Sequence, residues 1–341
     1  MLTIHPDHAR LRRLPARSAA ALAAVAVLSS CTLPFAIGQP TTRALESGAA
    51  DSLDAAKSFR IAGSYTDPTD HWTIDMELVR PGTRHLTLSG RTFALEAIVT
   101  EGYGGAFFRG QKFLSTQLGS DPLSRNIVQA TGDAWWRGPA SIAPELPDFT
   151  KGSSFRSTFL GTSVTSRTDH VSDGGVAAIE LSGPRADVFI AEAAPHRILR
   201  VIVKKGAVID GFSEADLRYS DFDRNFDIVV RCCAINFADL STLPPIYTVQ
   251  YVDTSGCGSP CVVSASLKNL GGTRGARGPS SVTFKMTDPA SGAALGSCEA
   301  TVQPDVDHSA ATTASCTIGG VSGKDHNAAE VTATTYNPGH A

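Results

Sequence analysis

The stretch WTIDMELVRPGTRHLTLSG, residues 72–90, alternates apolar and polar side chains with a period of two on both sides of a turn signal. Its apolar positions before and after Pro81-Gly82 are Trp72, Ile74, Met76 and Leu78, then Leu86 and Leu88. Because successive side chains of a strand point to opposite faces, this alternation predicts two strands that share one apolar face. The stretch therefore predicts a β-hairpin.

The same period continues on both sides of the hairpin. The flanking apolar positions are Phe59, Ile61 and Tyr65 upstream, and Phe93, Leu95, Ala97 and Val99 downstream. Turn signals at Asp67-Pro68 and Ser89-Gly90 separate the runs, so we expect a meander of antiparallel strands. Residues 43–57 predict a short amphipathic helix, and residues 111–130 lose the alternation and predict helices lying across the sheet.

Strand signals return later in the chain, and they change in character after Leu243-Pro244-Pro245. The predicted strands are 177–181, 186–191, 198–203 and 226–231 before this point, and 247–251, 262–267, 281–286 and 331–334 after it. Small residues, Thr and Cys dominate the second group, as in a small β-sandwich. We expect a mainly β protein with an α+β domain at 44–240 and a small β-sandwich at 246–335.

The beginning of the chain predicts export. Leu28-Ser29-Ser30-Cys31 has the pattern of a lipobox, whose cysteine receives a diacylglyceryl group. An apolar run at 19–28 precedes it, far shorter than the roughly 20 residues that span a bilayer. The basic residues before this run are Arg10, Arg12, Arg13 and Arg17. We predict a signal peptide at 1–30, a lipidated tether at 31–43 and anchoring to the outer face of a bacterial cell membrane.

Two other interpretations of this segment remain open. In the first, the segment is an ordinary cleaved signal and Cys31 is an incidental thiol. In the second, it is a twin-arginine signal at Arg12-Arg13. Both still export the chain. After residue 30 the chain has 26 Lys and Arg against 32 Asp and Glu, so its acidic balance does not favour nucleic-acid binding.

Cysteine usage agrees with an oxidising compartment. Besides Cys31 the chain has six cysteines, all in its last third: Cys232, Cys233, Cys257, Cys261, Cys298 and Cys316. Disulfides are the first expectation. Cys257 and Cys261 could close a tight loop, and Cys298 and Cys316 could join a hairpin or two facing sheets. A zinc site is the competing interpretation, which the ligand spacing disfavours.

The first domain resembles the LolA/LolB and LppX/LprG group of exported carriers over about residues 44–240. The segments that carry this resemblance are AKSFRIAGSY (56–65), the hairpin at 72–90, FALEAIVTEGYGGAFFRGQKFL (93–114), GDAWWRGP (132–139), PHRILRVIVKKG (195–206) and GFSEADLRYSDF (211–222). The resemblance implies a curved antiparallel half-barrel, closed by helices over an apolar cavity that takes acyl chains. It also implies binding or transport of lipids and lipoproteins without covalent chemistry.

The candidate cavity residues are the apolar positions of the predicted sheet and of the helix that follows it. They are Trp72, Ile74, Met76, Leu86, Leu88, Phe93, Leu95, Phe107, Phe113 and Leu114. Ordinary core packing is the competing interpretation, because every one-sided sheet shows such positions.

The C-terminal part resembles the Ig-like modules of bacterial surface proteins, of the CARDB or FxLYD kind, over about residues 246–335. VVSASLKNLGG (262–272) and SSVTFKMTDPASGAALGSCEATVQP (280–304) carry the resemblance. It implies a role in spacing or binding rather than in catalysis.

Catalytic and metal-binding signatures are missing from the sequence. It contains no G-x-S-x-G, H-E-x-x-H, P-loop or dinucleotide motif. The oxygens at 221, 223, 225 and 227 resemble a calcium loop, but Phe226 and Cys232 replace its glycine and its bidentate Glu, so we interpret the run as a strand. We expect no cofactor and no metal.

The predicted function is non-covalent binding or carriage of a lipid or acylated ligand by a lipid-anchored protein. The alternative is a cell-envelope interaction or scaffold protein that has a filled half-barrel core and uses its Ig-like module to bind an envelope protein. A hydrolase is a more distant alternative, because a triad can assemble from residues far apart in sequence.

Overall fold

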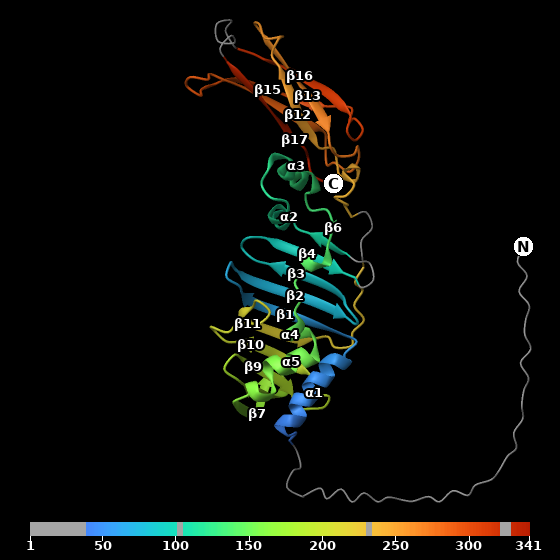
Figure 1. Ribbon diagram of the computed structural model, residues 1–341, viewed down its shortest axis with the longest axis vertical. Helices are drawn as coiled ribbons and strands as arrows, with labels where there is room; N and C mark the ends of the chain where they lie inside the picture. The colour runs from blue at the N-terminus through green and yellow to red at the C-terminus, as the bar shows by residue number, and fades with distance from the viewer. Residues whose placement is uncertain (1–38, 101–104, 230–233, 321–328) are drawn as a thin grey trace, which may run out of the picture. The chain divides into compact units, whose positions relative to one another are not determined.

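The computed structural model describes residues 39–100, 105–229, 234–320 and 329–341 (Figure 1). The signal segment, Cys31 and most of the tether lie outside these residues. Pro40–Ala341 form one compact unit, so the domain limits stay predictions. In the described part of the chain no helix has the length and apolar character needed to cross a membrane.

The largest element is an open antiparallel sheet of eleven strands, which confirms the predicted mainly β class. Its order is β6-β5-β4-β3-β2-β1-β11-β10-β9-β8-β7. The strands are β1 (Ser58–Thr66), β2 (His71–Val79), β3 (Thr83–Ser89), β4 (Ala94–Val99), β5 (Ala106–Arg109), β6 (Trp136–Gly138), β7 (Ser166–Asp173), β8 (Val176–Ser182), β9 (Ala186–Ala191), β10 (Ile198–Val203) and β11 (Ser213–Ser220).

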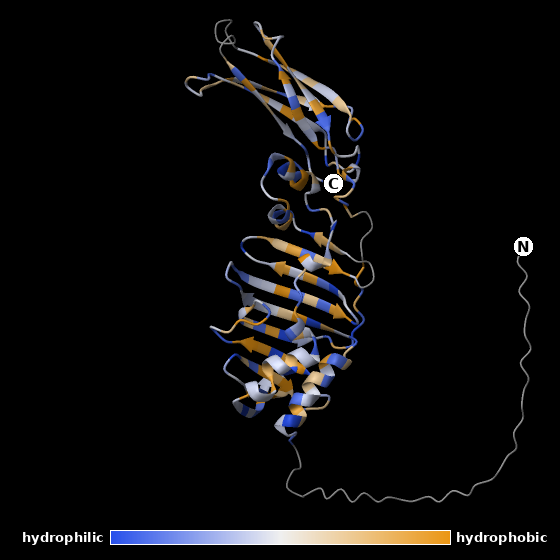
Figure 2. Cartoon of the chain, in the orientation of Figure 1, coloured by the Kyte–Doolittle hydropathy of each residue, from blue (hydrophilic) through white to orange (hydrophobic). Residues whose placement is uncertain are grey.

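The sheet consists of two meanders that meet where β1 pairs with β11. In the first meander each strand pairs with its successor, as the sequence predicts, so that Met76 lies opposite both Ile61 and Leu86. Hydrophobic and hydrophilic residues alternate along these strands (Figure 2). The apolar face buries Phe59, Ile61 and Ile74 almost completely, as expected for a sheet covered on one side.

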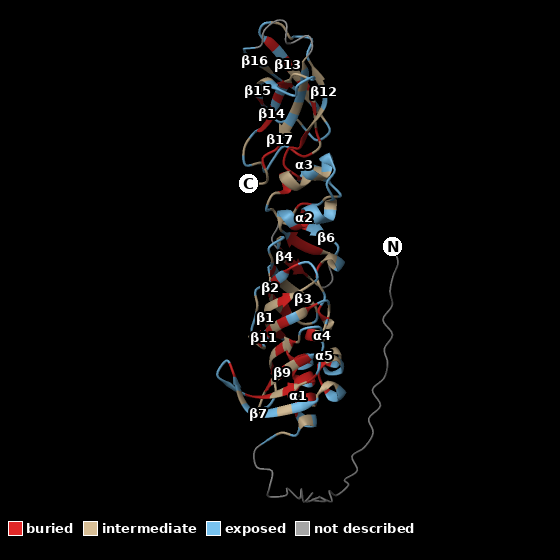
Figure 3. Ribbon diagram, turned by 90° about the vertical axis from the view of Figure 1, so that its left-hand side faces the viewer, coloured by how far each residue is buried: buried red, intermediate tan, exposed pale blue. Residues whose placement is uncertain are grey.

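Helices cover the apolar face of the sheet, and buried residues gather between the two layers (Figure 3). The helices are α1 (Thr42–Ala55), α2 (Gln111–Leu118), α3 (Pro122–Thr131), α4 (Pro147–Thr150) and α5 (Gly152–Phe159), with short 3₁₀ turns η1 (Ala140–Ile142), η2 (Gly161–Ser163) and η3 (Leu240–Thr242). The first of them confirms the amphipathic helix predicted at 43–57. It begins at the N-cap Thr41, whose hydroxyl accepts from Ala44 N at 3.2 Å, and it buries Leu45 and Leu53.

The strand predicted at 226–231 is wrong for the described residues, since 226–229 carry no regular structure. The acidic run at 221–227, which we also interpreted as a strand, forms a turn instead. Asp221 and Asp223 have φ of 53° and 60°, and the Asp223 carboxylate accepts from Lys57 N and Arg197 Nη2 at 2.9 and 2.7 Å. These contacts hold the chain in a turn after β11, which the alternation of acids and apolar residues did not reveal.

The C-terminal part forms two three-stranded antiparallel sheets, ordered β12-β13-β16 and β15-β14-β17. Their strands are β12 (Tyr247–Asp253), β13 (Cys261–Asn269), β14 (Ser280–Thr287), β15 (Ala294–Val302), β16 (Ala311–Ile318) and β17 (Glu330–Tyr336). The two sheets share a second hydrophobic cluster that includes Val263, Phe284 and Ile318. This arrangement agrees with the predicted sandwich.

Disulfides join both cysteine pairs that the sequence singled out. Cys257 and Cys261 close a loop, and Cys298 on β15 is bonded to Cys316 on β16. Because these two strands belong to different sheets, the second bond joins facing sheets and not the strands of one hairpin. The remaining candidates, Cys232 and Cys233, lie outside the described residues.

We predict that Gly63→Ala weakens the junction between the two meanders. A Cβ at this position would lie 1.9 Å from the backbone oxygen of Asp216 on β11, so the paired strands would have to separate. We expect the free energy of unfolding in urea to fall by about 1–3 kcal/mol, as for other overpacked sites. Gly82→Ala is the control, because its Cβ meets nothing within 4 Å. Equal stability of the two variants would contradict the prediction.

Candidate functional site

Nine of the ten candidate cavity residues lie in or against one hydrophobic cluster on the helix-covered face of the sheet. Trp72, Ile74, Met76, Leu86, Leu88, Leu95, Phe113 and Leu114 are buried members, and Phe93 packs against them. Aromatic rings form a connected group within the cluster: Trp72 and Phe93 have ring centroids 4.6 Å apart, and Phe93 and Phe113 5.2 Å apart. The alternation therefore identified the inward face correctly, while a role of these residues in ligand binding stays a prediction.

Phe107, the tenth candidate, lies outside this cluster. Phe108 takes the inward position, because it pairs with the buried Ala97 across β4 and β5, and directly opposed residues share a face. Phe107 lies beneath the Arg137 guanidinium, which is 5.2 Å from its ring centroid. Because Phe107 and Phe108 are adjacent and identical, the sequence pattern alone does not show which of them faces inward.

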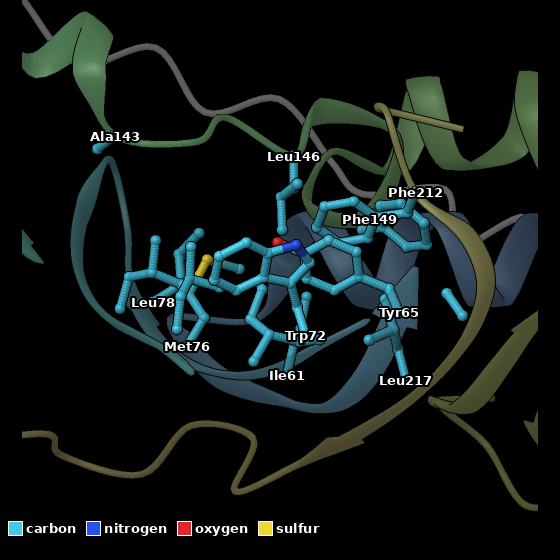
Figure 4. Close-up of a cluster of buried hydrophobic side chains, with 14 of the residues drawn as sticks. Ile61, Tyr65, Trp72, Met76, Leu78, Ala143, Leu146, Phe149, Phe212 and Leu217 are labelled. Carbon is cyan, nitrogen blue, oxygen red and sulfur yellow. The ribbon is translucent and has the colours of Figure 1, made fainter. Parts of the chain in front are cut away.

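A segment that the sequence did not single out covers the middle of the cluster. We call residues 139–146 the strap. Its Ala143 and Leu146 are 2 % and 4 % exposed, and Leu146 points toward the side chains of Trp72 and Met76 (Figure 4). The helix-covered face of the sheet is therefore filled in its centre by the chain's own residues.

No hydrogen bond joins the strap to a strand within the described part of the chain. Two of its hydrogen bonds are internal, from Ile142 N to Pro139 O and from Ala143 N to Ala140 O, and its last residue, Leu146, accepts from Phe149 N and Thr150 N of α4. The strap can therefore leave the sheet without breaking a hydrogen bond to it.

The helices after the strap are fixed by polar contacts instead. Tyr219 donates its hydroxyl to Phe149 O at 2.8 Å, and burial raises the pKa of Tyr219 well above its ordinary value, so the donor stays protonated. Arg80 Nη2 donates to Thr150 O at 2.7 Å, and Gly152 N donates to the Asp54 carboxylate at 2.7 Å. The chain thus changes at Leu146 from a segment held by apolar packing to helices held by hydrogen bonds.

Two small pockets flank the strap. One has a volume of about 160 Å³ and is lined by aromatic side chains including Tyr65, Trp72 and Phe93, with Ile142 of the strap. The other has a volume of about 130 Å³ and lies between Met76, Leu78 and Leu146. Each is smaller than the roughly 300–1,000 Å³ of a typical ligand site.

The described residues offer no cluster of metal ligands. They contain no group of three His, Cys, Asp or Glu side chains that could hold a metal ion. The acidic turn at Asp221 and Asp223 is held by Arg224 and Arg197, which occupy its carboxylates.

Comparison with known proteins gives no family. No protein-family model and no curated protein matches the chain. Among solved structures, the crystal structure of MucB in complex with MucA(peri) is 10 % identical and covers 88 % of this chain and 99 % of that chain, with a TM-score of 0.24. Since so low a TM-score carries no argument, fold and function rest here on the chain's own residues.

We predict that Leu146→Ala loosens the strap. The substitution leaves a cavity above Trp72 and Met76, and it should lower the free energy of unfolding by about 2–5 kcal/mol. Because Glu145 in the strap is exposed, a glutamate-specific protease should cleave there faster in the folded variant than in the wild type. Ile142→Ala, at a half-buried strap position, should have a smaller effect on both measurements. Unchanged cleavage in Leu146→Ala would show that Leu146 does not hold the strap.

Proposed function

We propose that this chain is an exported, lipid-anchored binding protein without enzymatic activity, and that it takes one apolar chain of a lipid or acylated ligand beneath the strap. The observation that carries the proposal is the pair of pockets on either side of a segment that makes no hydrogen bond to the sheet in the described part of the chain. When the strap lifts, the two pockets join through the space that Leu146 and Ala143 fill. An acyl chain would then replace the apolar contacts that these side chains make, so little apolar surface would meet water.

The alternative is an envelope interaction protein with a filled core. The small volume of each pocket supports this alternative, because neither pocket holds a lipid while the strap is in place. The C-terminal sandwich adds two exposed tyrosines, Tyr251 and Tyr336, which are 65 % and 56 % exposed. Tyrosine is enriched at protein interfaces, so this part of the chain would supply the contact with a protein partner.

Native mass spectrometry with organic extraction separates the two proposals. The protein would start after Cys31 and be purified from a host that exports it. A carrier should retain a stoichiometric lipid and lose it in Met76→Trp and Leu95→Trp, which fill the two pocket regions. Leu123→Trp, at a position 42 % exposed, is the control and should keep the lipid. A clean apo mass that ignores added phospholipid would favour the interaction protein.

The lipid anchor has a separate test. Cys31→Ser removes the only thiol of the lipobox, so the variant should fail to incorporate labelled palmitate and should leave the membrane fraction. The conservative variant Ser29→Ala keeps the thiol and the small residues before it, so it should still be labelled. Labelling of Cys31→Ser equal to that of the wild type would rule out this cysteine as the attachment site.

A further inference from the structure

Arg84 on β3 is a charged residue on the apolar face of the sheet. It lies opposite the buried Leu78 and two positions before the buried Leu86 in the same strand. Its Nε and Nη2 atoms are buried and have no hydrogen-bond partner in the described part of the chain. Buried donors without partners are uncommon because they lose their bonds to water and gain nothing in return.

The two unpartnered nitrogens form the side of a guanidinium that binds a carboxylate with two parallel hydrogen bonds. The same protein shows this arrangement twice on the outer face of the sheet. Arg60 binds Asp75, with Nε 2.7 Å from Oδ1 and Nη2 bonded to Oδ2. Arg200 binds Asp216 in the same way, with Nε 2.6 Å from Oδ1. Arg84 presents the same pair of donors without a carboxylate.

The space around Arg84 suits an anion with an apolar stem. Arg84 lines the pocket of about 130 Å³, whose other walls include the apolar side chains of Met76, Leu78 and Leu146. The charged residues that border this pocket are Arg84, Lys151 and Glu145, which leaves one net positive charge. Burial lowers the pKa of Arg84, and Glu145 opposes this shift. Because an arginine keeps its charge at neutral pH, the guanidinium is charged and poorly solvated.

We propose that the pocket at Arg84 binds the carboxylate of a monocarboxylic acid with an apolar chain, through two parallel hydrogen bonds from Nε and Nη2. The Nε and Nη2 atoms of Arg84 are already buried, so binding costs less desolvation there than at an exposed arginine. Its carboxylate would supply the acceptors that the buried donors lack.

The size of the pocket sets how much of the ligand enters. A volume of about 130 Å³ corresponds to about four water molecules, at about 30 Å³ each, so it holds a carboxylate and the first carbons of the stem. The pocket is partly open, so the end of a short acid such as hexanoate extends out of it. A longer chain would continue beneath the strap toward the aromatic pocket, and for such a ligand the inference rests on the proposed function. A short acid needs no movement of the strap, which makes the two hypotheses separable.

The test is calorimetric titration with hexanoate as the probe. The protein starts after Cys31, and any co-purified lipid is first removed by extraction. We expect saturable binding of one hexanoate, with hexanol at least tenfold weaker because it lacks the charge. Arg84→Lys keeps the charge but loses the paired donors, and should weaken hexanoate binding at least tenfold. Arg43→Lys, at an exposed position of α1, is the matched control and should bind like the wild type. Glu145→Gln removes a competing carboxylate and should bind at least as tightly.

The other outcomes are also decisive. Absence of hexanoate binding at millimolar concentration, or equal binding by Arg84→Lys, would overturn the inference. Binding of inorganic phosphate as tight as that of hexanoate would show a general anion site without use of the apolar walls, and would overturn it as well. Hexanoate binding without palmitate binding would refute the carrier proposal alone. Palmitate binding that Arg84→Lys leaves unchanged would refute the inference alone.

Discussion

The pairing of β1 with β11 is the constraint on which the rest of the large sheet depends. Each meander is built from neighbours in sequence, but these two strands lie about 150 residues apart and join the meanders into one surface. The junction requires close backbone approach, and Gly63 provides it because any side chain there would meet Asp216 O. With the junction formed, β1 and β2 lie in the middle of the sheet. Their inward residues can then make the single apolar face that α1, α4, α5 and the strap cover.

The cover of that face is held in two different ways, and this difference matters for function. Hydrogen bonds from Tyr219 and Arg80 fix α4, so its displacement would leave buried polar groups unpaired. In the described part of the chain no hydrogen bond joins the strap to the sheet, and the strap packs on the sheet by burying Ala143 and Leu146. An apolar ligand can replace that kind of contact without loss of hydrogen bonds. A binding event would therefore affect the strap first and leave the helices in place.

The sequence predicted the strands of this sheet better than the residues that cover it. Alternation placed Trp72, Met76 and Leu86 on the inward face because the period of a strand depends only on local geometry. It could not choose between Phe107 and Phe108, since that choice depends on the register with β4. It also gave no sign of the strap, whose residues have no period and are placed by contacts distant in sequence. At 221–227 the alternation was misleading, because Lys57 and Arg197 hold Asp223 in a turn.

Arg84 shows that one relevant signal was present in the sequence. Arg84, Leu86 and Leu88 are every second residue of β3 and therefore share a face. The alternation that defined the apolar face thus also placed a guanidinium on it. On the outer face, Arg60 and Arg200 find carboxylates on neighbouring strands, and their side chains are 39 % and 22 % exposed. On the inner face the neighbours at the same register are Leu78 and Val99, which offer no acceptor. A buried donor without an acceptor lowers stability, so the two unpartnered nitrogens of Arg84 support the inferred ligand as the source of the missing acceptors.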